Sequence, residues 1–173
     1  MKLWRRGFNH YLVAALLLGA AGCSTTDKED APPLTSLSVH LEAGSAEAGQ
    51  SGSVRILRSR PLSINIQFRP FLTQDHVVKA DLHDSFGTHD IALHLNREGQ
   101  LILHNTLRAN PGMRIAFHCE FGQEEEGRWL AAPSYDPREV QDVLVFTPDA
   151  SRDESVRVVL GLNQLARKAG RKL

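Results

Sequence analysis

The cysteine at position 23 has the most clearly defined chemistry in this sequence, because of the residues that precede it. Three basic residues lie within the first six positions, an apolar run follows at 11–18, and small residues occupy 20–22. This order of charge, apolar run and small-residue cleavage site is typical of a secretory signal peptide. The apolar run is too short to span a bilayer, which needs about 20 apolar residues. We therefore expect cleavage before Cys23, which places its thiol at the new N-terminus.

A cysteine at the cleavage point is typical of bacterial lipoprotein signals, in which the thiol takes a diacylglycerol. We expect Cys23 to be lipidated, so that the membrane is a partner through this anchor. Each buried acyl methylene contributes about 0.8 kcal/mol, so more than one chain gives durable attachment. Ser24 follows Cys23, and there is no Asp at this position. This pattern favours transfer to the outer membrane, where the anchored protein faces the periplasm. The alternatives are an uncleaved anchor or an ordinary signal with an incidental cysteine, and Ala20 stands where lipoproteins usually carry Leu.

The sequence predicts three segments, namely a signal at 1–22, a tether at 23–33 and one domain at 34–173. The tether is polar and charged and ends in two prolines, a composition that favours disorder. The whole chain has 20 basic and 20 acidic residues, and loss of the signal's three basic residues leaves 17 against 20. The resulting net charge near −3 argues against a nucleic-acid partner, since such proteins present a concentrated basic face.

Cys119, the second cysteine, lies in a run of alternating apolar and polar residues. Ile115, Phe117 and Phe121 share its face, and a cysteine on an apolar face usually acts as a small buried hydrophobe. A reactive thiol is the alternative, but no basic residue adjoins it on that face to lower its pKa. If Cys23 is lipidated, Cys119 has no partner for an intramolecular disulfide.

The eight histidines raise the hypothesis of a metal site, with His83 and His94 as the candidate ligands. Their spacings match no metal-binding motif. His94 and Asp90 lie four residues apart in a predicted strand and so share a face, which a solvated polar surface explains equally well. We therefore predict no metal or cofactor. A small-ligand or metal-sensing role for this histidine-bearing hairpin is kept as the alternative function.

Motifs for a nucleophile elbow, a phosphate-binding loop and a dinucleotide site are all missing from the sequence. The acidic run at 124–126 fits a solvated turn better than paired-carboxylate catalysis. We therefore predict that the protein is not an enzyme. Trp129 and Tyr135 are the candidate partner-binding residues, and the alternative for Trp129 is packing in the core or in a hairpin.

Alternating apolar and polar residues predict eight strands. These strands lie at 37–42, 54–57, 62–69, 77–84, 90–95, 113–121, 128–132 and 142–146. The segment 43–53 is rich in Gly, Ser and Ala without periodicity and predicts a loop, while 73–76 predicts a short turn.

Two helices complete the prediction. The first covers 99–109 and stops at Asn110-Pro111-Gly112. The second follows Ser151, which has capping-box spacing to Glu154, and carries an apolar stripe to Ala169. Strands with two helices that do not alternate regularly predict an α+β fold, with a single antiparallel sheet and both helices packed on one face.

Several segments occur in an order that resembles the head subdomain of the first large periplasmic domain of SecD, a subunit of the SecDF protein-export accessory complex. They are 112–116 (GMRIA), 128–133 (RWLAAP), 142–154 (DVLVFTPDASRDE) and 159–163 (VLGLN), with 70–73 (PFLT) and 80–82 (ADL) similar to its opening. The likeness covers about 34–168 and is closest to stand-alone bacterial proteins that carry this subdomain.

The resemblance implies an α+β module outside the membrane that touches the translocating chain. SecD couples export to proton flow through transmembrane helices and their acidic residues, and these have no matching positions here. We therefore predict a non-enzymatic, lipid-anchored periplasmic module that binds unfolded or envelope proteins, auxiliary to protein export or envelope assembly. An exposed sheet edge could accept an extended segment by strand addition.

Overall fold

The computed structural model describes residues 35–44, 49–56, 61–85, 87–121, 127–136, 138 and 142–171. The predicted signal, the tether, Cys23 and the acidic run at 124–126 all lie outside these residues. Among the helices of the described ranges, none is long and apolar enough to cross a membrane.

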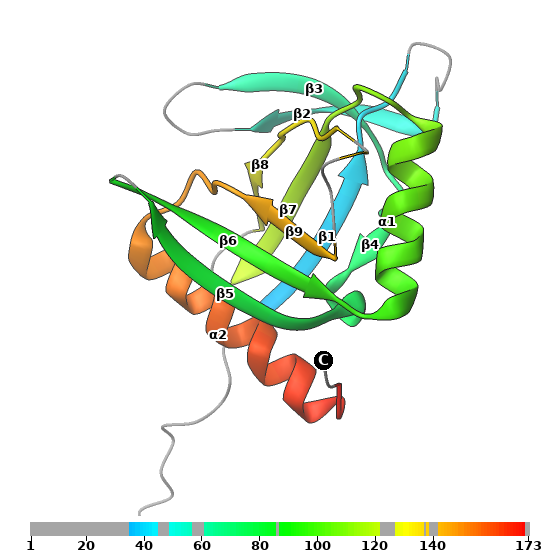
Figure 1. Cartoon of the computed structure of the whole chain (residues 1–173). Helices are drawn as coiled ribbons and strands as arrows, with labels where there is room; N and C mark the ends of the chain where they lie inside the picture. Colours follow the sequence, from blue (N-terminus) through cyan, green and yellow to red (C-terminus); the bar gives the residue numbers. More distant parts are fainter. Residues whose placement is uncertain are drawn as a thin grey trace, which may run out of the picture. The chain divides into compact units, whose positions relative to one another are not determined.

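A four-stranded antiparallel sheet, sheet A, forms the back of the domain in Figure 1. Its centre is the pair β1 (Thr35–Leu41) and β7 (Ile115–Phe121). The short strand β4 (Leu72–Thr73) flanks β1, and β8 (Arg128–Ala131) flanks β7. The strand order is therefore β4-β1-β7-β8, so partners far apart in sequence pair side by side.

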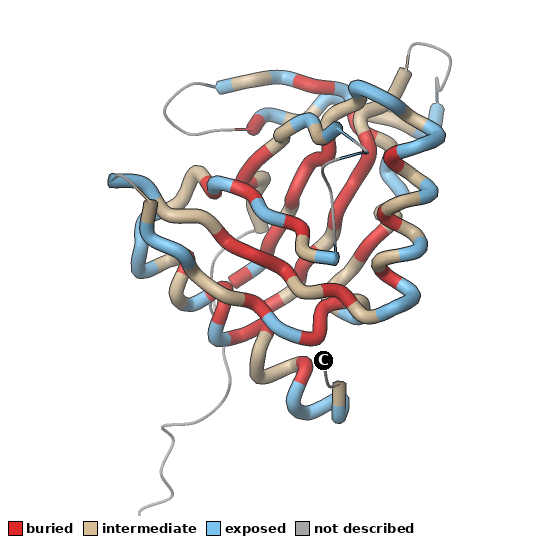
Figure 2. The backbone as a smooth tube through the Cα atoms, viewed as in Figure 1, coloured by how far each residue is buried: buried red, intermediate tan, exposed pale blue. Residues whose placement is uncertain are grey.

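A three-stranded antiparallel sheet, sheet C, faces sheet A across the main core (Figure 1). Strands β5 (Val77–Ser85) and β6 (Thr88–Leu95) form the predicted hairpin, and β9 (Val143–Phe146) pairs with β6. Phe146 of β9 stacks on Phe117 of β7, with ring centroids 4.0 Å apart and planes at 15°. This aromatic pair joins the two sheets directly, and Figure 2 shows the buried segments lining the space between them.

Helix α1 (Arg97–Ala109) begins at Asn96, whose side chain accepts a hydrogen bond from the backbone N–H of Gly99 at 2.7 Å. This cap supplies a partner for one of the unpaired N–H groups of the first turn. Leu103 and Leu107 lie on its buried side and enter the main core beside β4 and β6.

Helix α2 (Arg152–Lys168) has the predicted capping box between Ser151 and Glu154, with both reciprocal hydrogen bonds present. It packs against β5 and against the ends of β1 and β7, on a different side of the core from α1 (Figure 1). A Cβ atom at Gly161 would collide with the side chain of Thr35, so glycine allows α2 to approach β1 closely. A 3-10 helix, η2 (Gln74–His76), occupies the predicted short turn.

A separate two-stranded sheet, formed by β2 (Ser51–Ile56) and β3 (Leu62–Gln67), covers the outer face of sheet A. Ile64 and Ile66 are buried there, together with Ile56 of β2 and with Ala116 of β7. Trp129 of β8 and Ala132 pack against this second, smaller cluster. Sheet A is therefore covered on both faces, by the main core on one side and by the β2–β3 hairpin on the other.

The predicted single antiparallel sheet with both helices on one face is wrong. The strands form three sheets, and the helices close two different sides of a core that lies between sheets A and C. Periodicity along a strand determines which side chains share a face, but it does not determine which strands pair. The α+β class itself is confirmed, since all strand pairs are antiparallel and the helices do not alternate with them.

The predicted elements differ from the observed ones mainly at their ends, and the two-residue strand β4 is missing from the prediction. The largest difference is at β2, which begins at Ser51, within the segment predicted as a loop. Ser51, Gly52 and Ser53 have weak strand propensity, yet they pair with Gln67, Ile66 and Asn65 of β3. Tertiary pairing therefore overrides local preference at this point.

An ion pair between Arg128 of β8 and Glu154 of α2 connects sheet A to the second helix. Arg128 Nη1 donates to Glu154 Oε1 at 3.0 Å and Nη2 lies 2.9 Å from Oε2, with both side chains mostly buried. Burial by itself raises the pKa of Glu154, but hydrogen bonds from Arg128 and from Ser151 outweigh it and lower the pKa to about 2. The folded domain therefore favours the charged carboxylate.

We expect Glu154→Gln to lower the free energy of unfolding by about 2 kcal/mol at pH 7, because it leaves the Arg128 guanidinium without its counter-ion. Since the pKa of Glu154 is lower in the folded chain than its ordinary 4.5, the stabilisation is complete above that pH and is lost as the pH falls toward 2. Urea unfolding across this range measures both effects. Asp153→Asn, at the exposed neighbouring residue, is the control, and an equal loss in both variants contradicts the prediction.

Candidate functional site

Trp129, one of the two predicted partner-binding residues, lies between sheet A and the β2–β3 hairpin. Its ring meets His40 edge-on, with centroids 5.1 Å apart, and tilts against His118 at 4.9 Å. The side chain is half-buried and packs against the cluster beneath the hairpin. The structure thus places Trp129 in the packing role that was the alternative from sequence, and its role in binding a partner stays a prediction.

His40 joins β1 to the hairpin on the same face of sheet A. Its Nδ1 donates to the carbonyl oxygen of Gln67 at 2.9 Å, so Nε2 accepts from the hydroxyl of Ser38 at 3.0 Å. Burial lowers the pKa of His40 below its ordinary 6.5, and the nearby His118 lowers it further, against the opposing effect of the Gln67 hydrogen bond. The hairpin is therefore held by a histidine that is stabilised in its neutral form.

Tyr135, the other predicted partner-binding residue, lies on the segment that follows β8. Its hydroxyl donates to the carbonyl oxygen of Val145 at 2.6 Å, and its ring packs against the main core. Burial raises the pKa of this phenol. Trp129 and Tyr135 are therefore not part of one site, because one lies under the hairpin and the other beside β9.

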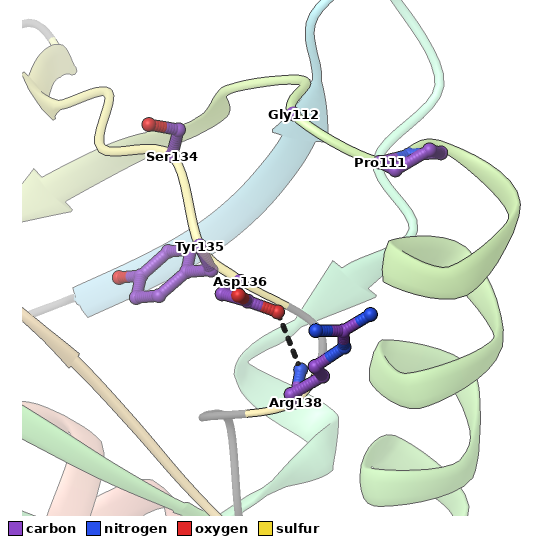
Figure 3. A pocket seen from close by; sticks show the side chains of 6 residues that line it. All are labelled: Pro111, Gly112, Ser134, Tyr135, Asp136 and Arg138. Atoms are coloured by element: carbon purple, nitrogen blue, oxygen red, sulfur yellow. Dashed lines mark hydrogen bonds between the residues drawn. The ribbon is translucent and has the colours of Figure 1, made fainter.

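A pocket of about 580 Å³ lies between the segment after α1 and the segment after β8 (Figure 3). The residues lining it are Pro111, Gly112, Ser134, Tyr135, Asp136 and Arg138. Gly112 has a φ of +79°, in the left-handed region that favours glycine, and this lets the chain turn from α1 toward β7. A hydrogen bond of 2.9 Å from the N–H of Ile115 to the carbonyl of Pro133 holds the second segment beside the first.

The charged residues of this pocket come from a local turn. The Asp136 carboxylate accepts a hydrogen bond from the backbone N–H of Arg138 at 2.9 Å, and both side chains are exposed. In Figure 3 the Arg138 guanidinium points toward α1, whereas the Tyr135 ring points away from it. Among the described lining residues, the pocket therefore offers an aromatic ring, a carboxylate and a guanidinium, which are groups suited to contact with a polypeptide.

The candidate metal ligands His83 and His94 are placed on β5 and β6 at different points of the hairpin. His94 pairs in register with Lys79, whereas His83 pairs with Asp90. His94 Nε2 lies 2.8 Å from Asp81 Oδ2. A hydrogen bond from Lys79 chiefly, assisted by one from His94, lowers the pKa of Asp81. Across the ranges that the structure describes, no group of three His, Cys, Asp or Glu side chains could hold a metal ion.

Cys119 is fully buried on the inner face of β7, as predicted. Burial raises the pKa of its thiol to about 12, and the charge of Glu120 adds to this rise. Because the thiolate is the reactive form, this environment favours the structural role of the residue over a chemical one.

Groups of the chain itself bind backbone atoms at three of the sheet edges. Asn163 of α2 meets β5 as a neighbouring strand would, because its Nδ2 donates to the carbonyl of Ala80 and its Oδ1 accepts from the N–H of Ala80, both at 2.8 Å. At β8, the carbonyl of Leu130 accepts from the N–H of Asp149 at 2.8 Å. At β9, the carbonyl of Val145 accepts from the Tyr135 hydroxyl, as described above. Sequence reasoning missed Asn163, although it belongs to the segment 159–163 that carries the resemblance.

Comparison with known proteins shows likeness at the level of structure. No protein-family model matches the sequence, and no curated protein matches it either. A structure of SecDF, a membrane component that enhances protein export, matches with a TM-score of 0.52 and 18% identity, covering 76% of this chain and 63% of that chain. SecDF in a super-membrane-facing form matches with a TM-score of 0.53 and 18% identity, over 76% of this chain and 19% of the other.

The chain thus spans less than two thirds of either SecDF chain that it matches. These matches confirm the SecD-like fold that the sequence resemblance implied.

We expect the β2–β3 hairpin to loosen on acidification, because the pKa of His40 is lower in the folded chain than its ordinary 6.5. Its stabilising effect is complete above that pH and is lost as the pH falls below the folded pKa. Between pH 7.5 and 5, the hydrogen-exchange protection factor of the Ile64 amide should fall by about threefold more than that of sheet C amides.

His40→Asn should remove this difference, because the Asn amide keeps a donor near the position of Nδ1 but does not titrate. His83→Asn, at an exposed histidine of β5, is the matched control and should behave as the wild type. If the hairpin of the His40→Asn variant still loosens at pH 5, another group is responsible.

Proposed function

We propose that this SecD-like domain is a non-enzymatic, lipid-anchored protein-binding module of the bacterial cell envelope that assists protein export. The observation that carries the proposal is the similarity of its fold, over 76% of the chain, to a membrane component that enhances protein export. The proposal places the domain on the periplasmic side of the outer membrane, attached through Cys23.

The pocket beside α1 supports a binding role for the domain. Its 580 Å³ are lined by a tyrosine ring, exposed backbone at Gly112 and the charged side chains of Asp136 and Arg138. A polypeptide segment can use the ring for apolar contact and the two charges for orientation.

The N-terminal sequence supports the anchoring part of the proposal. The small residues at 20–22 precede Cys23, and Ser24 follows it. The polar segment 24–33 then provides about 10 residues between the proposed lipid and the domain. A linker this short would keep the domain close to the membrane surface.

Cys23→Ala should abolish labelling with radioactive palmitate and release the protein from the membrane fraction. The reason is that the proposed thioether and its acyl chains supply the attachment. Fractionation of cells after osmotic lysis measures the release. Cys119→Ala, which alters the other cysteine, should leave both properties intact, and an unlabelled Cys23→Ala variant that stays with the membrane contradicts the anchoring proposal.

A photo-crosslinking amino acid at Ser134, on the rim of the pocket, should capture protein partners in intact cells. Ser134 is exposed and borders Tyr135, so the probe reaches a bound segment without disturbing the core. The same probe at Thr88, an exposed residue at the tip of the β5–β6 hairpin, is the control. Mass spectrometry of the adducts identifies the partners. Recovery of lipid or small molecules alone from both positions contradicts a protein-binding function.

A further inference from the structure

The hydrogen-bond pattern of the β2–β3 hairpin determines which backbone groups of β2 point outward. Phe68 N–H donates to the carbonyl of Gln50 at 2.9 Å, so this opposed pair is a hydrogen-bonded one. In an antiparallel ladder such pairs alternate, and the register therefore assigns the same pattern to Gly52 with Ile66. The N–H and C=O groups of Ser53 and Arg55 consequently point away from β3.

Two of the equivalent outward carbonyl groups of β3 are occupied. The carbonyl of Asn65 accepts from the N–H of Ala43 at 2.8 Å, and that of Gln67 accepts from His40. In the described part of the chain, the outward backbone groups of Ser53 and Arg55 have no such partner. Among the described residues, the outer side of β2 is therefore a sheet edge with two consecutive outward positions, Ser53 and Arg55, whose backbone groups are available for pairing.

An apolar surface adjoins this open edge. Phe68 is 59% exposed, and its ring lies against the backbone of Gly52. A Cβ atom added at Gly52 would lie only 2.6 Å from this ring. A cavity of about 440 Å³ at the same end of the hairpin is lined by Gly49, Gln50, Gln67, Phe68 and Arg69. A side chain of an added strand could pack against the phenyl ring at this position.

Charge distinguishes between possible occupants of the edge. Arg55 and Arg69 are exposed, and β2 and the cavity lining contain no acidic residue. Antiparallel pairing of two copies through β2 would bring these arginines of one molecule near those of the other, at a cost in repulsion. A neutral or acidic extended chain meets no such repulsion.

We infer that the outer edge of β2 binds an extended, neutral or acidic segment of an unfolded polypeptide by strand addition. The added strand pairs with the backbone groups of Ser53 and Arg55 and places a side chain against Phe68. Backbone pairing provides affinity without demanding a particular sequence. This inference deepens the proposed protein-binding function and rests on it.

Ser53→Pro tests the inference, because proline removes an outward N–H that the β2–β3 ladder does not use. The full-length chain in detergent is titrated against fluorescently labelled, reduced and carboxymethylated α-lactalbumin, an acidic chain that stays unfolded. We expect Ser53→Pro to weaken binding at least tenfold and Ser53→Ala, the matched control that keeps the N–H, to change it less than twofold. Native α-lactalbumin should not bind.

If a folded Ser53→Pro variant binds the probe as tightly as the wild type does, the inference is overturned. The proposed function then still stands on the crosslinking at Ser134. If Ser53→Pro does not fold, hydrogen exchange of the wild type decides, since a saturating probe must slow the amides of Ser53 and Arg55. Unchanged exchange there overturns the inference. So does a wild-type dimer in analytical ultracentrifugation that Ser53→Pro dissociates, because the occupant is then a second copy.

Discussion

The central strands β1 and β7 must be buried on both faces, and the arrangement of the other elements follows from this constraint. On one face, Phe117 stacks on Phe146 and sheet C covers the core between them. On the other face, Ala116 is wholly buried and His40 is only 7% exposed, because the β2–β3 hairpin lies over them. Without the hairpin, an apolar strip would face water and His40 would lose the Gln67 carbonyl that accepts its hydrogen bond.

The two covers of sheet A differ greatly in how firmly they are attached. The main core joins both sheets and both helices, and α2 is further tied to β8 by the pair Arg128–Glu154. The hairpin is attached through a small apolar cluster, the Trp129 ring, the His40 hydrogen bond and a backbone bridge between the end of β1 and β3. Local opening of a protein begins where few buried contacts hold an element. The hairpin is therefore held by fewer buried contacts than the cover on the other face.

Coverage of strand edges connects this architecture to function. An open edge presents unpaired backbone groups that pair readily with another extended chain, and natural proteins usually protect such edges. Here Asn163, on a helix, imitates a strand partner for Ala80, and the Tyr135 hydroxyl occupies a carbonyl of β9. These devices keep the main sheets from indiscriminate pairing. In the described part of the chain, the outer side of β2 in the hairpin keeps backbone groups available for such pairing at Ser53 and Arg55.

The sequence by itself determined the element types, the caps and the inward faces. The period-2 pattern around Cys119 predicted its burial, and Ser151 with Glu154 predicted the start of α2, because both depend on residues close together in the chain. Only the tertiary structure decided that the strands form three sheets, that His40 is buried and that Trp129 and Tyr135 lie apart. Those properties depend on which distant segments pair, and neither spacing nor propensity along the chain contains that information.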